Sequence, residues 1–494
     1  MRRSRWAASA AGLLPGVSAA VAIGLLLVVF VRVDPPSGVT ASASPFTDEA
    51  WHVLNARNLV LFGQFSTDDY NLHLLTAPFS VAVAAVFSVL GVGMAQARLV
   101  AILATGLTVG LLAIGLRSIV GRWPALVAGL AFGTSALVLY YGRLAFLEPL
   151  EGLFLVTALV LVVRDGEHHR FVLGLVAGIA LALAIGTKAS AAIPAAGIVA
   201  GLAVAHVRER RDWRLVTGCI SGLGLSAAGW LVAVGLPNMH ALPAVLSTLP
   251  PEPLPGSVDE LLKRVAGYVV HSDGAWPMAG PLIVGTLIAG AIGVAARSRL
   301  SAPQRTLLLV ATGWAVAGFA ILFLVPYRPN RYVVPLLPAL AGIVGVGLAL
   351  LAGFEVRRRV QQLSLVAVGV LAVAGLTAPG LVLDAHWMAT TPSTLPGIQA
   401  RVAGLLPPGA TVQGAYAPLL AMTARVTAIV VWPGGKVNAG DLYASRGVRW
   451  VVGTPGRAAD VPSWVSLHPG AWAVRRTVDC VPWGGDQVCL WAVP

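Results

Sequence analysis

The chain has 494 residues, of which 57% are hydrophobic and only 11% are charged. An ordinary soluble domain carries about 25% charged residues, so this composition excludes a purely soluble protein. The formal net charge is +13, and many of the basic residues lie in short clusters between apolar segments. That placement is typical of a membrane topology signal and argues against nucleic acid as a partner.

Apolar segments long enough to cross a hydrocarbon core of about 30 Å recur from residue 12 to residue 383. They predict an all-α polytopic membrane domain over residues 1–383 with about eleven transmembrane helices. The start resembles a signal peptide, but its apolar run is long and no clear cleavage site follows, so we expect a retained first helix. The predicted spans lie near 12–33, 97–116, 123–141, 149–163, 171–187, 189–206, 215–236, 279–296, 306–325, 332–353 and 362–383.

The segment 75–92 decides the predicted topology. If it crossed the membrane, the later basic clusters would lie outside, against the positive-inside rule. If it lies along the outer interface or re-enters, those clusters become cytoplasmic, and Pro78 and Gly91-Val92-Gly93 favour this second arrangement. We therefore expect interfacial helices in the first outer loop. The basic residues concerned are Arg117, Arg122, Arg164, Arg170, Arg208, Arg210, Arg211, Arg214 and Arg357-Arg358-Arg359.

Residues 384–494 differ in composition and are rich in Pro, Gly and Trp. Short apolar runs at 411–413, 426–432 and 448–452 predict a small extracytoplasmic α/β domain, in which most tryptophans pack in the core. Cys480 and Cys489 either form a disulfide, which an extracytoplasmic location permits, or stay as free thiols. Cys219 lies in an apolar segment and is expected to pack there.

Acidic residues follow two of the predicted outer helix ends. Asp48 and Glu49 come after the first span, and Glu148 precedes Pro149 at the start of another. One interpretation is helix capping, with Thr47 as the N-cap and the carboxylates in the first turn. The other is a catalytic site, because group transfer needs a carboxylate that deprotonates or orients the acceptor.

Basic residues supply the complementary charge on the same predicted face. Lys188 interrupts two apolar segments, and Arg328 and Arg331 flank a Pro-Asn turn just before Tyr332. Arginine binds phosphate through its planar fork and lysine as a point charge. Snorkelling at helix ends is the alternative for each, but ionisable residues near hydrocarbon by default mark a functional site.

Five short motifs then occur in a familiar order. They are Asp48-Glu49-Ala50-Trp51, Ala97-Arg98-Leu99, Tyr141-Gly142-Arg143 through Glu148, Gly186-Thr187-Lys188, and Arg331-Tyr332-Val333-Val334-Pro335-Leu336-Leu337-Pro338. In this order they resemble the GT-C glycosyltransferases, above all the branch of protein O-mannosyltransferases and lipid A aminoarabinose transferases. The resemblance covers about residues 1–383.

The resemblance implies an inverting glycosyltransferase that moves a monosaccharide from a polyprenyl-phosphate donor to a glycan, lipid or protein acceptor. The reaction would take place at the outer face of the cytoplasmic membrane. Asp48 and Glu49 match the first-loop acidic pair, with Asp48 as base or acceptor-orienting group, and Glu148 matches the second acidic position. Lys188 and Arg331 would neutralise the leaving phosphate. The other predicted substrate-binding residues are Arg143, Arg328, Tyr332 and His73.

Three points stay open at this stage. Relatives carry a His-Pro-Pro or similar signature before the interfacial segment, where this chain has Asn71 to Pro78, so His73 is the residue that could keep that role. Some relatives bind a divalent metal ion through first-loop acidic residues and others work without one. The identities of the sugar and of the acceptor are likewise not determined.

A transporter or flippase of polyprenyl-linked sugars is the alternative function. It predicts charges buried in mid-span and a repeat between the two halves of the chain. No convincing repeat is present, and the notable charges lie at outer helix ends. A scaffold that only presents the terminal domain does not explain the outward charges, so the enzyme is the favoured interpretation.

Overall fold

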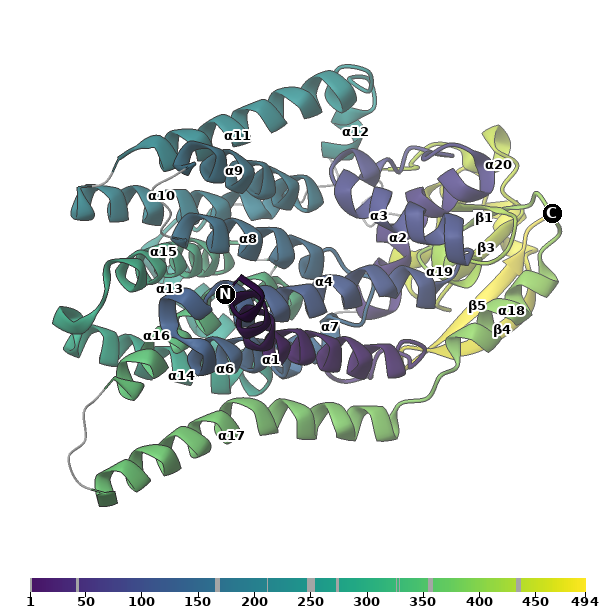
Figure 1. Cartoon of the computed structure of the whole chain (residues 1–494). Helices are drawn as coiled ribbons and strands as arrows, with labels where there is room; N and C mark the ends of the chain where they lie inside the picture. The colour runs from purple at the N-terminus through teal and green to yellow at the C-terminus, as the bar shows by residue number, and fades with distance from the viewer. Residues whose placement is uncertain are drawn as a thin grey trace.

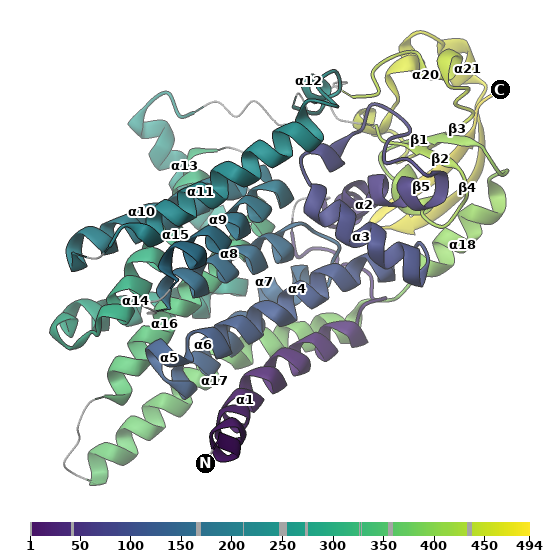
Figure 2. The same cartoon turned by 45° about the horizontal axis from the view of Figure 1, so that its top comes forward.

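A computed structural model describes the chain except for residues 1, 41–43, 165–168, 211, 247–253, 272–274, 326, 328, 354–358 and 432–436. The described part forms a long bundle of helices with a small sheet domain at one end (Figures 1 and 2). The predicted all-α membrane domain with a small C-terminal α/β domain is thereby confirmed.

The helices follow one another along the whole membrane domain. They are α1 (Arg2–Val29), α2 (Ser44–Phe62), α3 (Ala77–Leu90), α4 (Met94–Gly115), α5 (Arg117–Val120), α6 (Arg122–Gly133), α7 (Ala136–Tyr141), α8 (Glu148–Val163), α9 (Arg170–Thr187), α10 (Ala192–Glu209), α11 (Arg214–Trp230), α12 (Leu242–Leu246), α13 (Val258–His271), α14 (Ala275–Ala295), α15 (Ala302–Leu324), α16 (Leu337–Ala352) and α17 (Arg359–Thr390). A 3₁₀ segment, η5 (Asn330–Leu336), leads into α16.

Nine segments of the described chain are long and apolar enough to cross a membrane. They lie in α1, α4 with α5, α9, α10, α11, α14, α15, η5 with α16, and α17. The chain is therefore a multi-pass membrane protein. The two remaining predicted spans are built from shorter pieces: 123–141 breaks into α6 and α7, and 149–163 is the 16-residue α8.

The segment between α1 and α4 contains no helix long and apolar enough to cross the membrane among its described residues. Its helix α3 has 14 residues, which at 1.5 Å per residue is shorter than the hydrocarbon core of about 30 Å. This agrees with the prediction that 75–92 does not span. Helices α2 and α3 lie between the membrane helices and the sheet domain in both views (Figures 1 and 2).

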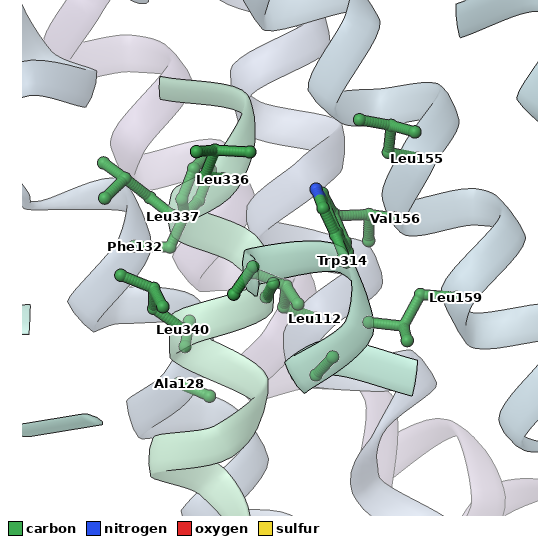
Figure 3. Packing of buried hydrophobic residues seen from close by; sticks show 14 of the residues in the cluster. Leu112, Ala128, Phe132, Leu155, Val156, Leu159, Trp314, Leu336, Leu337 and Leu340 are labelled. Carbon is green, nitrogen blue, oxygen red and sulfur yellow. The ribbon is translucent and has the colours of Figure 1, made fainter. Parts of the chain in front are cut away.

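Large apolar side chains fill the centre of the bundle (Figure 3). Trp314 of α15 is fully buried and lies beside Val156 of α8, while Phe132 of α6 lies near Leu337 of α16. Elsewhere small residues let backbones touch. A Cβ added to Gly222 of α11 would lie 2.2 Å from the carbonyl oxygen of Leu175 on α9, which is the close helix contact that small residues permit in membranes.

The sheet domain has five strands in the order β2-β1-β3-β5-β4. Strands β1 (Thr411–Gln413), β2 (Thr427–Ile429) and β3 (Trp450–Gly453) are parallel and match the three predicted runs. The antiparallel hairpin of β4 (Arg476–Trp483) and β5 (Asp486–Ala492) was not predicted as strands. Cys480 and Cys489 are paired across it and joined by a disulfide. Trp464, Trp483 and Trp491 are buried, as expected of core tryptophans.

Buried polar contacts attach the sheet domain to the segment between α1 and α4. Arg57 of α2 is fully buried and donates hydrogen bonds of 2.6–3.0 Å to four backbone carbonyls between Ala421 and Val426. Asp34, after α1, accepts hydrogen bonds from the backbone of Thr394 and Leu395 at the start of α18 (Leu395–Leu405). These contacts give partners to backbone groups that a helix end or a loop leaves unpaired, and they hold the segment between α1 and α4 against the sheet domain.

Candidate active site

Helix α2 carries Asp48 to the end of the helix bundle that lies against the sheet domain (Figures 1 and 2). The helix begins at Ser44, so Thr47 is an internal residue, and its predicted role as N-cap is wrong. Instead, the Thr47 hydroxyl donates to Asp48 Oδ1 at 3.0 Å. The other oxygen, Oδ2, lies 2.9 Å from Nη2 of Arg331. Asp48 is therefore held by a distant cation and not by its own helix terminus.

Glu49 is bound on a different side of α2. Arg98 of α4 donates to both of its carboxylate oxygens at 2.8 and 2.7 Å, and the backbone N–H of Ala145 donates to Oε1 at 2.7 Å. Both Glu49 and Arg98 are almost fully buried. These contacts use both oxygens and join α2 to α4, while the catalytic role predicted for Glu49 stays a prediction.

Glu148 is the first residue of α8, directly before Pro149, and is 1% exposed. Its Oε1 accepts a hydrogen bond from Lys188 Nζ at 2.7 Å and lies 3.2 Å from Arg331 Nε. Lys188 follows the last residue of α9, and its Nζ also lies 3.4 Å from the centre of the Tyr332 ring. The Glu148 carboxylate at the start of α8 is thus contacted by two cationic side chains, Lys188 after α9 and Arg331 in η5.

Arg331, in η5, connects the two predicted acidic sites. It contacts Asp48 and Glu148, donates to the Tyr327 hydroxyl at 3.3 Å and lies 5.0 Å from the Phe146 ring centre. Two carboxylates and two cations thereby meet in one place. We call the set Asp48, Glu148, Lys188 and Arg331 the charge cluster, and its formal charges balance.

Several buried polar atoms in and beside the charge cluster have no hydrogen-bond partner within the described protein. Twelve buried polar side-chain atoms in the described residues lack a hydrogen-bond partner, and five of them lie in or beside the cluster. Leaving such atoms unpaired costs about 1–3 kcal/mol each, so their concentration indicates a ligand site. The five atoms are His52 Nδ1, Glu148 Oε2, Glu151 Oε2, Arg331 Nε and Arg331 Nη1. Of these, Arg331 Nε is ion-paired with Glu148 Oε1 at 3.2 Å but lacks hydrogen-bond geometry.

A cavity of about 300 Å³ reaches the charge cluster from the membrane helices. Lys188, Glu151, Tyr327 and Tyr332 form its polar end. The remaining wall is mostly apolar and comes from α10, α15 and η5, so the cavity suits a ligand with an apolar chain and an anionic head. We call it the lipid-side cavity; its apolar residues are Ile193, Pro194, Ile321, Leu322, Val325, Pro335 and Leu336.

His52 was not among the predicted site residues. It lies four residues after Asp48 on α2, and its ring packs edge-on against Phe146 at 5.6 Å. Burial lowers the pKa of His52 to about 4, so the imidazole is neutral at physiological pH. The spacing of four residues on one helix, which places two side chains on one face, is the signal that would have found it.

Two other predicted residues, Arg143 and His73, lie apart from the charge cluster. Arg143 donates to the backbone carbonyls of Val33 and Asp34 at 2.9 and 3.3 Å and so holds the loop after α1. The His73 ring stacks on Phe65 at 4.7 Å. Arg328 lies outside the described residues. The structure therefore brings together Asp48, Glu148, Lys188, Arg331 and Tyr332.

The described residues include no group of three His, Cys, Asp or Glu side chains placed to hold a metal ion. Asp48 and Glu148, the carboxylates nearest to such a role, are each engaged by a cation. Both carboxylates are thus ion-paired in this structure, and a divalent ion, which the sequence left open, stays untested.

Comparison with known proteins places this arrangement in context. Residues 77–233 match the model of the family described as dolichyl-phosphate-mannose-protein mannosyltransferase. A comparison with curated proteins found no match.

Solved structures resemble the chain over most of its length. ArnT from Cupriavidus metallidurans, bound to undecaprenyl phosphate, has a TM-score of 0.65 and 17% identity, and the match covers 95% of this chain and 97% of ArnT. The oligosaccharyltransferase AglB from Archaeoglobus fulgidus, in complex with an inhibitory peptide and dolichol-phosphate, has a TM-score of 0.53 and 12% identity, covering 89% and 69%. The mycobacterial arabinofuranosyltransferase AftD has a TM-score of 0.55 and 18% identity, covering 97% of this chain but 40% of AftD.

Proposed function

The chain has the GT-C fold, as its sequence motifs predicted, and we propose that it is an inverting glycosyltransferase. Its donor would be a monosaccharide linked to a polyprenyl phosphate, and its acceptor would bind at the outer face of the cytoplasmic membrane. The printed ligands of ArnT and AglB, undecaprenyl phosphate and dolichol-phosphate, support a polyprenyl carrier.

One observation carries the proposal. The charge cluster, with its unpaired buried atoms, lies at the end of a cavity that opens among membrane helices. A polyprenyl phosphate has the matching chemistry, because its chain is apolar and its head is an anion. Lys188 and Arg331 supply the cations that an anionic head needs at that end.

The proposed reaction uses the cluster's residues in distinct roles. The acceptor hydroxyl oxygen attacks the anomeric carbon, and the bond between that carbon and the phosphate oxygen breaks. The electron pair leaves with the phosphate, whose charge is stabilised by Lys188 and Arg331. When the phosphate engages Arg331, Asp48 loses its cation and becomes available to take the acceptor proton. Glu148 then keeps Lys188 in place.

Charge and disulfide placement support an outward site. The helices place Arg117, Arg122, Arg170 and Arg214 at the ends opposite to the charge cluster, which is where the positive-inside rule expects the cytoplasm. The disulfide between Cys480 and Cys489 is of the kind that persists in oxidising compartments. Both observations favour an extracytoplasmic cluster and sheet domain.

The test separates donor binding from transfer. Undecaprenyl phosphate binding is measured on the full chain in detergent, and sugar transfer is measured with a panel of undecaprenyl-phosphate sugars. Lys188→Met should weaken lipid binding about 10–100-fold, because a charged hydrogen bond contributes about 1.5–3 kcal/mol. Lys263→Met, at a lysine that is 76% exposed, is the matched control and should leave binding unchanged.

Asp48→Asn should retain lipid binding and lose transfer. Wild-type transfer by the Asp48→Asn variant would contradict the proposed role of Asp48. If the wild type moved undecaprenyl-phosphate sugars across vesicles without transferring the sugar, the transporter alternative would replace the proposal.

A further inference from the structure

One ionisable residue of the lipid-side cavity has no role in the reaction described above. Glu151, in the first turn of α8, lines this cavity together with Lys188 of the charge cluster. The residue is 2% exposed, and its Oε2 has no hydrogen-bond partner among the described residues. A buried polar atom without a partner costs free energy. Its place in the cavity wall therefore indicates a partner that enters the cavity.

The cations near Glu151 are already paired with other carboxylates. Lys188 Nζ lies 2.7 Å from Glu148 Oε1. Arg331 lies 2.9 Å from Asp48 and 3.2 Å from Glu148, and among the described residues neither cation forms an ion pair with Glu151. Glu148 also precedes Glu151 by three residues on the same face of α8, and two neighbouring carboxylates disfavour each other's charge. A negative charge on Glu151 would therefore be uncompensated.

The other elements packed against α8 bring no further charge to Glu151. Helix α8 contacts α4, α9, α10, α15, α16 and η5. The ionisable residue of α4 is Arg98, which is bound to Glu49, and α16 has none. Lys188 and Glu148 are the charged groups that act on Glu151, and Tyr327 and Tyr332 are the titratable groups beside them in the cavity. Helices α10 and α15 carry their ionisable residues at the ends away from the cavity: His206, Arg208, Glu209 and Arg305.

A carboxyl group in these surroundings is more stable as a neutral acid than as an anion. An ionised carboxylate that is buried among apolar groups without a cation is costly, and such a group holds a proton instead. The wall opposite Glu151 is mostly apolar. A neutral carboxylic acid has an O–H, which is a hydrogen-bond donor that the carboxylate lacks. The acid can therefore donate to an anion that enters the cavity, whereas the carboxylate would repel it.

We propose that Glu151 binds the phosphate of the donor lipid, to which it donates a hydrogen bond as a neutral carboxylic acid. The inference rests on the proposed function, since this phosphate is the one that Lys188 and Arg331 hold there. A phosphodiester has a single negative charge and two free oxygens, so one oxygen can face the cations while the other accepts from Glu151. Donor binding then requires a proton on Glu151, and the affinity falls as the pH rises because the carboxylate and the phosphate repel each other.

The test compares three variants with the wild type over a range of pH. Glu151→Gln keeps a hydrogen-bond donor and cannot ionise, whereas Glu151→Leu removes the donor. Asp259→Asn, at a side chain of α13 that is 73% exposed, is the matched control for the loss of one carboxylate. The ligand is methyl undecaprenyl phosphate, which is a phosphodiester like the donor. Its binding to the full chain in detergent is measured by calorimetry from about pH 6 to pH 9, between the ordinary pKa values of Glu and those of Lys and Tyr.

The wild type and Asp259→Asn should bind this lipid with an affinity that falls about tenfold or more from pH 6 to pH 9. The fall should disappear in Glu151→Gln, which keeps every other titratable group, and its affinity at pH 6 should equal that of the wild type. Glu151→Leu should bind about tenfold more weakly at pH 6, because a hydrogen bond to a charged group is lost. A role of Glu151 in packing alone would not make the difference between wild type and Glu151→Gln depend on pH.

A wild-type affinity that stays constant over this range would overturn the inference, as would an equal fall in Glu151→Gln or an undiminished affinity of Glu151→Leu at pH 6. If the same proteins still transferred sugar, the proposed function would stand without it. Lipid binding with the expected pH dependence but without sugar transfer would support the role of Glu151 and contradict the proposed transferase. A wild type that binds no methyl undecaprenyl phosphate at any pH would contradict both the proposed donor and the inference.

Discussion

Glu148 offers the sharpest test of the charge cluster. Its Oε1 lies 2.7 Å from Lys188 Nζ and 3.2 Å from Arg331 Nε, and the residue is 1% exposed. Glu148→Gln keeps the shape but removes one of two negative charges, so two cations remain opposite one carboxylate. Removing one partner of a buried ion pair costs about 3–5 kcal/mol, and we expect a loss of this size in the free energy of unfolding.

The double variant Glu148→Gln with Lys188→Met restores the balance of charges, since Asp48 and Arg331 remain paired at 2.9 Å. We therefore expect its loss in free energy of unfolding to be about 2 kcal/mol smaller than the summed losses of the single variants Glu148→Gln and Lys188→Met. The free energy of unfolding is measured for all four proteins by titration with dodecyl sulfate in mixed micelles, followed by tryptophan fluorescence.

Glu151→Gln is the matched control for this cycle. Glu151 lies three residues further on α8, is equally buried, and has an oxygen without a hydrogen-bond partner. Its substitution should leave stability unchanged or raise it, because a neutral amide is less costly to bury than a carboxylate. The reasoning would be refuted if the stability lost by the double variant equalled the sum of the losses of Glu148→Gln and Lys188→Met within about 0.5 kcal/mol. It would also be refuted if Glu151→Gln lost as much stability as Glu148→Gln.

Two further predictions concern the attachment of the sheet domain. Arg57→Ala leaves four buried carbonyls unpaired and should destabilise the attachment of the sheet domain by at least about 3 kcal/mol, with Arg57→Lys intermediate. Limited proteolysis at residues 391–394 follows this loosening. An Arg57→Ala variant as resistant to the protease as the wild type would contradict the prediction. Burial raises the pKa of Asp68, which accepts a hydrogen bond from Asn438, to about 7 from 3.8. The folded state therefore holds this proton more tightly than the unfolded state, so the contribution of Asp68 to stability is full below about pH 4 and declines as the pH rises to about 7. Asp68→Asn should flatten the change of melting temperature over that interval, and a slope equal to that of the wild type would contradict the assignment.

The membrane domain was predictable because its signals are local. An apolar run must satisfy its own backbone hydrogen bonds in lipid, so its length alone predicts a helix. Charge placement then identified 75–92 as the segment that does not cross, and α3 is indeed short. The break between α6 and α7 and the strands β4 and β5 were not predicted, although Gly484-Gly485 between these strands is a local hairpin signal.

From the sequence alone, Asp48, Glu148, Lys188 and Arg331 were singled out as ionisable residues near the ends of predicted helices. Only the tertiary structure decided their partners. In the structure Glu49 is ion-paired with Arg98, and Arg331 is ion-paired with both Asp48 and Glu148. His52 lies beside them, packed against Phe146. The physical reason is that an ion pair forms between side chains brought together by helix packing, and sequence spacing carries no record of which distant helices pack side by side.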